Sequence, residues 1–481
     1  MEANLQQDKI YKNRWFILAI VVMQPFMACL DGSIINVALP VMAKSFNVSM
    51  ASIEWVVTTY LIMISATILI FGRIADIKGK GTVFKCGLVM FAFGSLLCGF
   101  PFSLEFLVFS RVVQALGASM TMATNQGIIT QVFPSNERGR ALGISGVFVA
   151  LGTMTGPPLG GLIISFFHWK YIFLINVPVG IITFIFSMKI LPKNEFQYEK
   201  MDSKGASLFF ICIVTLFLAM ITGQQVGYNN IFIIISFILS LFSFIYFISV
   251  EKRSEQPMLE LSIFKNKVFS INLFLAFIAY SSLSCINIIH PFYLQDVLKI
   301  SPGKAGLIMI THPVVLSLVA PISGYVSDKI GSKILTLAGL FFQGAGIFLL
   351  STLKENSDLA YIIAFIAVSA LGSGLFESPN NSLVMSTVPK NKLGIAGSIN
   401  ALVRNLGFIF GVSCATTILY NKMSYKIGYK VLSYVPGRDD VFIYGMKWVY
   451  ISASIFCFIG FTISLIDKIK INSKKSSGKV A

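Results

Sequence analysis

Residues 15–40 read WFILAIVVMQPFMACLDGSIINVALP, an apolar run in which Asp31 is the only charged residue. The run is long enough to cross a bilayer as a helix, which takes about 20 residues. A carboxylate inside such a segment costs about 2.5–3.5 kcal/mol on insertion scales, so it normally faces a protein-lined or water-filled cavity. We therefore interpret Asp31 as a functional residue, the alternative being an ion pair or cap that stays satisfied within the helix bundle.

The composition indicates that the rest of the chain is also suited to a membrane. Hydrophobic residues make up 55% of the 481 residues and charged residues only 12%, which predicts a polytopic membrane protein. The net charge of +17 does not predict a nucleic-acid partner, because the basic residues lie in short loops rather than on one polar surface. The seven cysteines lie in apolar runs without metal-ligand spacing, so we expect core residues, no disulfides and no metal site.

Apolar runs of about 20 residues predict an all-α polytopic membrane protein with fourteen spans. The spans are expected near 15–38, 51–73, 83–101, 104–130, 140–164, 170–191, 206–223, 231–249, 268–292, 304–325, 332–352, 359–386, 395–418 and 444–466.

The orientation follows from the loops. Lysine and arginine concentrate in alternate loops, which places both termini in the cytoplasm by the positive-inside rule. The loop at about 419–443 fits this rule least well, because it puts several positive charges outside. The first span is too long for the apolar region of a signal peptide and lacks a convincing cleavage site, so we expect it to remain. The prediction is a multi-pass protein of the cell (inner or plasma) membrane, in contact with the lipid bilayer.

A repeated loop indicates two related halves. GRIADIKGKG (72–81) follows the second span, and GYVSDKIGSK (324–333) follows the tenth. Duplicated halves around a central site are typical of transporters. We expect six-helix bundles at 1–192 and 268–466, two inserted helices with cytoplasmic flanks at 193–267, and a cytoplasmic basic tail at 467–481.

The repeated loop resembles motif A of the major facilitator superfamily, and further matches follow in the family's order. LDGSIINVALP (30–40) is similar to the first span of the fourteen-span drug:proton antiporters, LVFSRVVQALGAS (107–119) to motif B, GTMTGPPLGGLI (152–163) to motif C, and HWKYIFLINVPVG (168–180) to the sixth-span entry. Ile77, Gly81 and Ala115 depart from the usual Arg, Lys and Gly of these motifs. The resemblance implies two six-helix halves with two inserted helices, and motif C is associated with antiport.

The motif residues also have an interpretation from their own chemistry. In motif A we expect Asp76 and Asp328 to latch the halves on the inner side, the alternative being solvated turns; the motif also comprises Gly72, Gly79, Lys80, Gly324 and Gly331. In motif C, small residues at helical spacing permit close helix contact and proline bends the helix. This predicts a kinked sliding surface, or simple helix packing without coupling, from Gly152, Gly156, Pro157, Gly160 and Gly161.

Four of the charged residues form two possible pairs, because the members of each pair are expected at the same depth in the membrane. At 1.5 Å per residue, Asp31 and Arg111 are expected at similar depth in the membrane. The resemblance implies that spans one and four are neighbours. In that case Arg111 holds Asp31 ionised until a proton or a cationic substrate arrives. Glu377 and Arg404 form a second couple at matching depth. For Arg111 and for this couple, a purely structural pair is the alternative.

Other polar residues are weaker candidates. Glu54 stands at the outer mouth of span two, where it attracts cations or is a solvated helix end. His290 and His312, each followed by proline, suit a proton relay but are more often structural. Polar anchors for a mostly apolar cavity are Asn36, Tyr60, Gln114, Asn125, Gln126 and Asn400.

These observations predict a transporter rather than an enzyme. No GxxxxGK[ST] phosphate loop is present, which argues against ATP as the energy source. We expect a monomer without cofactors, driven by the proton gradient, that exports small amphipathic and often cationic compounds in exchange for protons. The alternatives are a dedicated exporter of one endogenous lipid, bile acid or secondary metabolite, and a non-transporting membrane receptor or scaffold.

Overall fold

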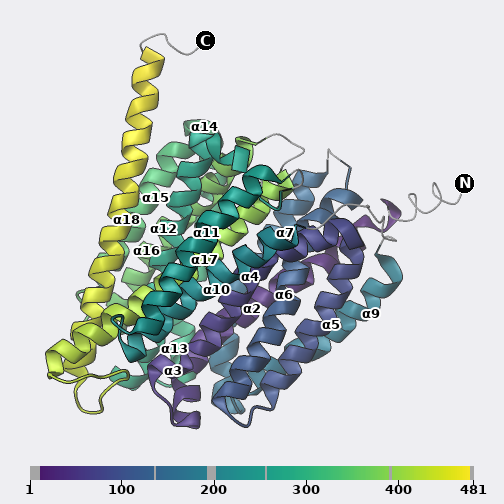
Figure 1. The fold of residues 1–481 in the computed structure, drawn as a ribbon. Coiled ribbons are helices and arrows are strands. Elements are labelled where there is room, and N and C mark those ends of the chain that lie inside the picture. The colour runs from purple at the N-terminus through teal and green to yellow at the C-terminus, as the bar shows by residue number, and fades with distance from the viewer. Residues whose placement is uncertain are drawn as a thin grey trace, which may run out of the picture. The chain divides into compact units, whose positions relative to one another are not determined.

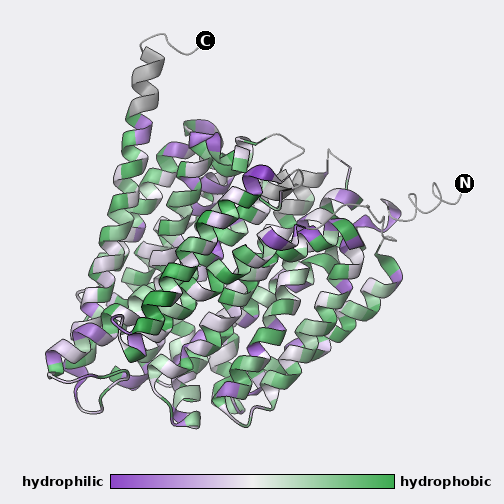
Figure 2. Cartoon of the chain, viewed as in Figure 1, coloured by the Kyte–Doolittle hydropathy of each residue, from purple (hydrophilic) through white to green (hydrophobic). Residues whose placement is uncertain are grey.

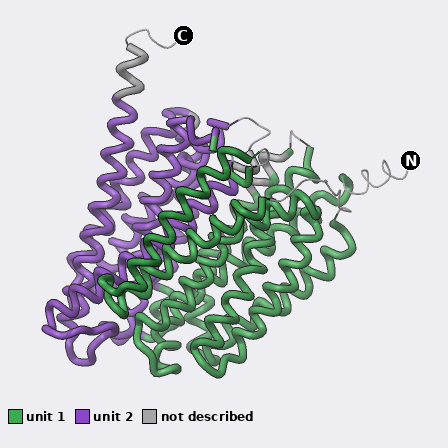
Figure 3. Tube along the Cα trace, viewed as in Figure 1, with its two compact units in different colours: residues 1–261, 301–307 green, residues 262–300, 308–481 purple. Residues whose placement is uncertain are grey.

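The structure is a computed structural model that describes residues 11–134, 137–191, 202–254, 257–259, 261–388 and 393–476. Within these ranges it contains helices and no strands. Contacts divide the chain into two compact units, unit 1 with residues 1–261 and 301–307 and unit 2 with residues 262–300 and 308–481 (Figure 3).

The helices follow one another with short connections (Figure 1). The first part of the chain forms α2 (Arg14–Phe46), α3 (Met50–Ile53), α4 (Trp55–Lys78), α5 (Lys80–Gly99), α6 (Leu104–Val132), α7 (Arg138–Phe166), α8 (Tyr171–Leu174), α9 (Asn176–Ile190), α10 (Ser203–Val226) and α11 (Ile231–Arg253). The second part forms η1 (Leu261–Lys265), α12 (Lys267–Phe292), η2 (Tyr293–Val297), α13 (Pro302–Met309), α14 (Thr311–Ile330), α15 (Ser332–Leu350), α16 (Leu359–Ser386), α17 (Leu393–Ile427) and α18 (Asp439–Ser476).

Fourteen segments in the described part of the chain are long and apolar enough to cross a membrane. This confirms the predicted fold class and the predicted number of spans. Hydrophobic colouring dominates along the helices and hydrophilic colouring is more common near their ends (Figure 2). The boundaries agree closely where the apolar run and the helix coincide, as in α16, for which 359–386 was predicted and Leu359–Ser386 is found.

The predicted loop at about 419–443 is wrong in its extent. α17 continues to Ile427 and α18 begins at Asp439. α17 stops at Gly428, whose φ of 90° lies in the left-handed region that glycine adopts readily. At the other side of the loop, Asp439 and Asp440 occupy the first turn of α18, where the helix dipole favours negative charge. Polar residues thus extend both helices beyond the apolar segments, and hydropathy does not detect such extensions.

The two repeated loops fold in the same way. Gly79 separates α4 from α5 with φ 87° and ψ 130°, and Gly331 separates α14 from α15 with φ 91° and ψ 137°. A positive φ with an extended ψ is a conformation that is almost restricted to glycine. The glycine therefore recurs because each loop reverses the chain with the same backbone geometry.

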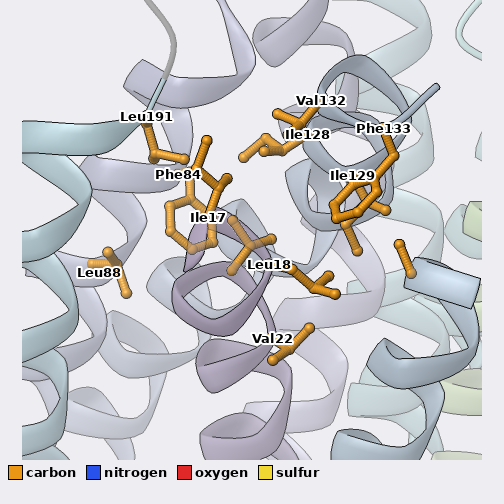
Figure 4. Close-up of a cluster of buried hydrophobic side chains, with 12 residues drawn as sticks. Ile17, Leu18, Val22, Phe84, Leu88, Ile128, Ile129, Val132, Phe133 and Leu191 are labelled. Atoms are coloured by element: carbon orange, nitrogen blue, oxygen red, sulfur yellow. The ribbon is translucent and has the colours of Figure 1, made fainter. Parts of the chain in front are cut away.

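Unit 1 has a hydrophobic cluster where α2 meets α5 and α6 (Figure 4). It comprises Ile17, Leu18, Val21, Val22, Phe84, Leu88, Ile128, Ile129, Val132, Phe133, Ala141 and Leu191, each at most 8% exposed. The two predicted inserted helices, α10 and α11, pack against each other, and α10 packs against α4. The apolar side chains of α2 thus fix the helix on which Asp31 lies.

The cysteines follow the prediction in part. None of the seven forms a disulfide. Cys86 on α5 is exposed, however, so the expectation that all seven are core residues is wrong for this one. A span has one face toward the bundle and another toward lipid, and an apolar run does not reveal which face a small residue occupies.

The turn geometry predicts a contrast between two glycine substitutions. Gly331→Ala should lower stability by about 1–3 kcal/mol, because alanine is strained at this φ even though no atom lies within 4 Å of the added Cβ. Gly72→Ala, in the interior of α4 and also without a neighbour within 4 Å, should be neutral or stabilising by up to about 1 kcal/mol. Thermal unfolding of the two purified variants in detergent measures both effects, and equal midpoints would contradict the assigned strain.

Candidate functional site

Asp31 lies in the interior of unit 1 and accepts three hydrogen bonds from side chains. The residue is 0% exposed. Its Oδ2 accepts from Arg111 Nη1 at 2.5 Å, and its Oδ1 accepts from Gln114 Nε2 at 2.9 Å and from Asn176 Nδ2 at 2.8 Å. The three donors come from α6 and α9, so a single carboxylate of α2 joins three helices. Hydrogen bonds to an ionised acceptor are among the stronger ones in proteins.

Arg111 is held by several groups besides Asp31. Its Nε donates to the carbonyl oxygen of Val56 on α4 at 2.9 Å, and its Nη1 also donates to Gln114 Oε1 at 2.5 Å. The ring centroid of Tyr60 lies 4.0 Å from the guanidinium carbon and that of Phe173 lies 5.7 Å away. Aromatic faces attract a guanidinium through their negative quadrupole. The fully buried charge pair is therefore neutral overall and enclosed by aromatic rings and amides.

Arg111 therefore has several partners besides Asp31. They are the Val56 carbonyl, the Gln114 amide oxygen and the Tyr60 ring. The Tyr60 hydroxyl, in a side chain that is 2% exposed, has no hydrogen-bond partner among the described residues. The pocket thus contains one further polar group that is available to a changed network.

Two amide side chains take part in the Asp31 network, and the sequence analysis predicted only one of them. Gln114 was predicted as a cavity residue, and it bridges Asp31 to the hydroxyl of Ser95 on α5, to which its Nε2 donates at 2.8 Å. Asn176 was missed, although it is the only amide in the apolar run YIFLINVPVG. A lone amide in a membrane span needs a hydrogen-bond partner, and that signal would have singled out Asn176.

Glu54 is 1% exposed, which contradicts its interpretation as a solvated helix end. Its predicted role in attracting cations stays a prediction. Its backbone is helical, with φ −60° and ψ −22°, and it joins the short α3 to α4. Because helix continues on both sides, Glu54 lies one turn inside a longer helical segment, next to Ile53, which is 0% exposed.

The remaining cavity candidates of unit 1 are not part of the Asp31 network. Asn125 is 4% exposed and connects helices, since its Nδ2 donates to the Val21 carbonyl and its Oδ1 accepts from Ser145, both at 3.5 Å. Asn36 and Gln126 are half-buried. Asn125 therefore braces the bundle, and the role of the other two stays a prediction.

The structure brings Glu377 and Arg404 to a common residue, Tyr280 of α12. The Tyr280 hydroxyl donates to Glu377 Oε1 at 2.9 Å, and the Arg404 guanidinium carbon lies 5.9 Å from the Tyr280 ring centroid. Asn400, a further candidate, donates through Nδ2 to Asn381 Oδ1 at 3.0 Å. Sequence reasoning missed Tyr280, whose signal is a phenol in the middle of the ninth span.

The motif A residues lie in the two turns and in the helices just before them, with Gly72 inside α4 and Gly324 inside α14. Asp76 forms an ion pair with Lys80 at 3.1 Å, and both side chains are partly exposed. In unit 2, a Cβ on Gly324 would lie 2.9 Å from Ser378 Oγ. The side chain of Asp328 lies outside the described residues. The predicted latch at Asp76 and Asp328 therefore stays a prediction.

The motif C glycines bring α7 directly against α2. A Cβ on Gly152 would overlap the Phe26 carbonyl, one on Gly156 would overlap Ser33 Oγ, and one on Gly160 would lie 2.8 Å from Ile34. On the same helix, a Cβ on Gly161 would lie 2.8 Å from the carbonyl of Pro302, in the 301–307 segment of unit 1. The four-residue spacing thus produces a close contact beside Asp31, and Pro157 and Pro158 lie within it.

Both histidines are buried and hydrogen-bonded. His290 Nδ1 lies 2.8 Å from the Tyr450 hydroxyl, and His312 Nε2 lies 3.3 Å from the Ser373 hydroxyl. Each contact joins two helices of unit 2, which agrees with the structural interpretation. Within the described residues, no group of three or more His, Cys, Asp or Glu side chains is placed to hold a metal ion.

A bundle of fourteen spans with a charge pair buried inside it has the architecture of a membrane transporter. The chain matches the Major Facilitator Superfamily over residues 22–412 and 273–480, and it belongs to this family. It is therefore a multi-pass membrane protein and a transporter of the superfamily.

Individual relatives differ in what they transport. The riboflavin transporter RibZ of Clostridioides difficile is 35% identical over 456 residues, which cover 94% of this chain and 97% of RibZ. The multidrug resistance protein Stp of Mycobacterium tuberculosis is 28% identical over 397 residues, which cover 82% of this chain and 74% of Stp. A crystal structure of a POT family transporter in complex with a thioalcohol-conjugated peptide has a TM-score of 0.68 at 15% identity, covering 95% of this chain and 96% of that chain. The last likeness concerns the fold alone.

The Asp31 network predicts a coupling between two substitutions. Arg111→Gln should destabilise the protein by about 3–5 kcal/mol, because it leaves a buried carboxylate without its counter-charge. Adding Asp31→Asn should recover most of this loss, since the double variant contains no buried charge at the site. Thermal unfolding of the wild type, both single variants and the double variant gives the coupling energy. Additive losses would show that the two charges do not depend on each other.

Proposed function

We propose that this protein is a proton-coupled secondary transporter that exports amphipathic, often cationic compounds from the cell. The observation that carries the proposal is the fully buried Asp31, which forms an ion pair with Arg111 inside a membrane bundle. Intramembrane carboxylates of this kind mark proton or substrate pathways in transporters. The similarity to multidrug resistance proteins such as Stp supports the broad substrate range.

The proposed cycle follows from the charge balance at Asp31. A proton from outside neutralises the carboxylate and weakens its hold on Gln114 and Asn176, which had donated to an ionised acceptor. Substrate leaves, the halves change their access, and the proton passes to the cytoplasm, after which Asp31 again forms its ion pair with Arg111. Helix α7, in close glycine contact with α2, is the surface along which α2 moves.

We place the protein in the inner or plasma membrane with both termini in the cytoplasm, following the distribution of Lys and Arg. The proton gradient supplies the energy, no cofactor takes part, and the monomer is the working unit. The motif A residues, with Asp76 next to Lys80, act at the inner gate.

A second candidate is a transporter dedicated to a single compound. The specific observation in its favour is the similarity to the riboflavin transporter RibZ, which extends over 94% of this chain at 35% identity. A flavin is planar and amphipathic, so it would suit a mostly apolar site with a few polar anchors. This candidate differs from the first in substrate range and not in the coupling residues.

The coupling proposal predicts the behaviour of Asp31→Asn. The variant should lose uptake driven by an imposed pH gradient in proteoliposomes by at least about tenfold, because asparagine cannot bind and release the proton. It should also bind substrate more weakly, because asparagine resembles the neutral carboxylate that releases substrate in the proposed cycle. Glu105→Gln, which changes an exposed carboxylate at the start of α6, serves as the control and should transport normally. Undiminished gradient-driven uptake by Asp31→Asn would remove Asp31 from the coupling step.

A substrate panel separates the two candidates. For the multidrug exporter, proton flux in vesicles should respond to several chemically unrelated cations. For the dedicated transporter, proton flux should respond to riboflavin and to few or no cations. Flux with none of the compounds would contradict both candidates and favour a protein that does not transport.

A further inference from the structure

The ends of α17 and α18 that meet at their connecting loop carry an excess of positive charge. Residues 419–448 include five lysine or arginine residues and two acidic residues, a net charge of +3. Both acidic residues are already engaged, since Asp440 accepts from Arg438 at 2.9 and 3.2 Å and Asp439 accepts from the Tyr434 hydroxyl. The region therefore keeps a net positive charge, and it is the part of the chain that fits the positive-inside rule least well.

Two lysines of α17 lie over aromatic rings of α18. Lys422 Nζ is 4.4 Å from the Trp448 ring centroid, and Lys426 Nζ is 5.7 Å from that of Tyr444. The two rings pack edge to face, with centroids 6.4 Å apart. A ring face attracts a cation but leaves its charge in place, and neither lysine forms an ion pair with a carboxylate of the described residues. The ammonium groups are thus held in position and keep their charge.

The spacing of the two lysines suits one bridging anion. Lys422 and Lys426 lie one turn apart on α17, which separates them by about 6 Å. Like charges at this spacing repel each other. A phosphate group relieves the repulsion, because hydrogen bonds of about 2.8 Å from both sides let one phosphate contact both ammonium groups. The fitting ligand of this surface is therefore an anion with several acceptor oxygens, such as a phosphate.

The position of the lysines along α17 coincides with the headgroup layer of a bilayer. The apolar run of this span ends near residue 418, and Lys422 and Lys426 lie about 6 and 12 Å further along the helix. The polar layer extends about 5–8 Å beyond the hydrocarbon, and a lysine side chain reaches back toward it. Tyr425 between the lysines is 78% exposed, as expected of tyrosine at a membrane interface. The ammonium groups therefore lie at the level of phospholipid phosphates.

An apolar surface continues from Trp448 toward the middle of the membrane. Trp448 is 36% exposed, and Ile455 and Ile459 of α18 are 55% and 48% exposed. Spacings of seven and eleven residues place all three on one face of the helix. A lipid whose headgroup contacts the lysines thus finds apolar surface for its acyl chains directly below. A free phosphate would leave this face unused.

From these observations we infer that Lys422, Lys426, Tyr444 and Trp448 form a binding site for the headgroup of an anionic phospholipid. Its phosphate accepts hydrogen bonds from both lysines, and its acyl chains lie along the exposed face of α18. Three spans separate this loop from the motif A turn of unit 2, so the site is on the opposite side of the membrane, which is the outer side in the orientation proposed above. The inference goes beyond the proposed transport and does not depend on the substrate.

Phosphatidylglycerol and phosphatidylcholine with identical acyl chains test the inference. Native mass spectrometry of the purified full-length protein in a neutral detergent gives the dissociation constant of the first bound molecule of each lipid. The wild type should bind phosphatidylglycerol about 25-fold more tightly, because each lysine near the membrane surface contributes about fivefold. Equal binding of the two lipids by the wild type would overturn the inference.

Two double variants separate this site from the general positive charge of the protein. Lys422→Gln combined with Lys426→Gln should reduce the preference for phosphatidylglycerol to about one. Lys252→Gln combined with Lys354→Gln removes the same charge from two exposed lysines elsewhere and should keep the preference. All four side chains are at least partly exposed, so the substitutions leave the core unchanged. A preference that survives in the first double variant would contradict the assignment.

A soluble headgroup distinguishes a lipid site from a simple anion site. Glycerol phosphate has the phosphate but no acyl chains, so at the same concentration it should not displace phosphatidylglycerol. Displacement would assign the site to a free anion and would refute the lipid assignment. Because binding is measured without a gradient, loss of proton-driven uptake in Asp31→Asn would leave these results unchanged.

Discussion

A charged group inside a bilayer has no water to stabilise it, and every arrangement around Asp31 follows from this constraint. The carboxylate accepts hydrogen bonds from Arg111, Gln114 and Asn176, and Arg111 in turn donates to the Val56 carbonyl. Helices α2, α4, α6 and α9 are therefore fixed relative to one another by polar contacts at one depth. Between helices in lipid the hydrophobic effect is weak, so such contacts carry more of the specificity than they would in a soluble bundle.

Close packing between helices, together with the polar contacts, sets the positions of the charged side chains. The glycines of α7 bring its backbone directly against α2 near Ser33 and Ile34, and apolar side chains such as Ile17 and Phe84 fill the space between α2, α5 and α6. In unit 2, Gly407 and Gly411 bring α17 equally close to α12. In both units a stripe of small residues lies beside the charged residues. Close backbone contact thus sets the position of each charged side chain.

The sequence predicted what depends on hydropathy and on repeated motifs. The fourteen spans, the glycine at each repeated turn and the matching depth of Asp31 and Arg111 all follow from local pattern or from counting residues along a helix. Asn176 and Tyr280 were missed because their partners come from other helices, and their role depends on how those helices rotate about their axes. Glu54 was interpreted as a possible solvated helix end, and its burial depends on neighbouring helices whose positions the sequence does not give. The contacts of Glu377 and Arg404 with Tyr280 depend on the approach of α12, which the sequence does not show.

The turn between α2 and α4 also limits how this part of unit 1 can move. α2 ends at Phe46, Asn47 adopts the left-handed conformation that caps it, and α3 begins at Met50 and runs into α4 through the buried Glu54. Only three residues, 47–49, lie outside helical structure, and Ser49 is itself tied down by accepting a hydrogen bond from the backbone of Ser52. So short a connection works as a stiff hinge that prevents the two helix ends from separating. Any movement at this end of unit 1 must therefore carry the ends of α2 and α4 together.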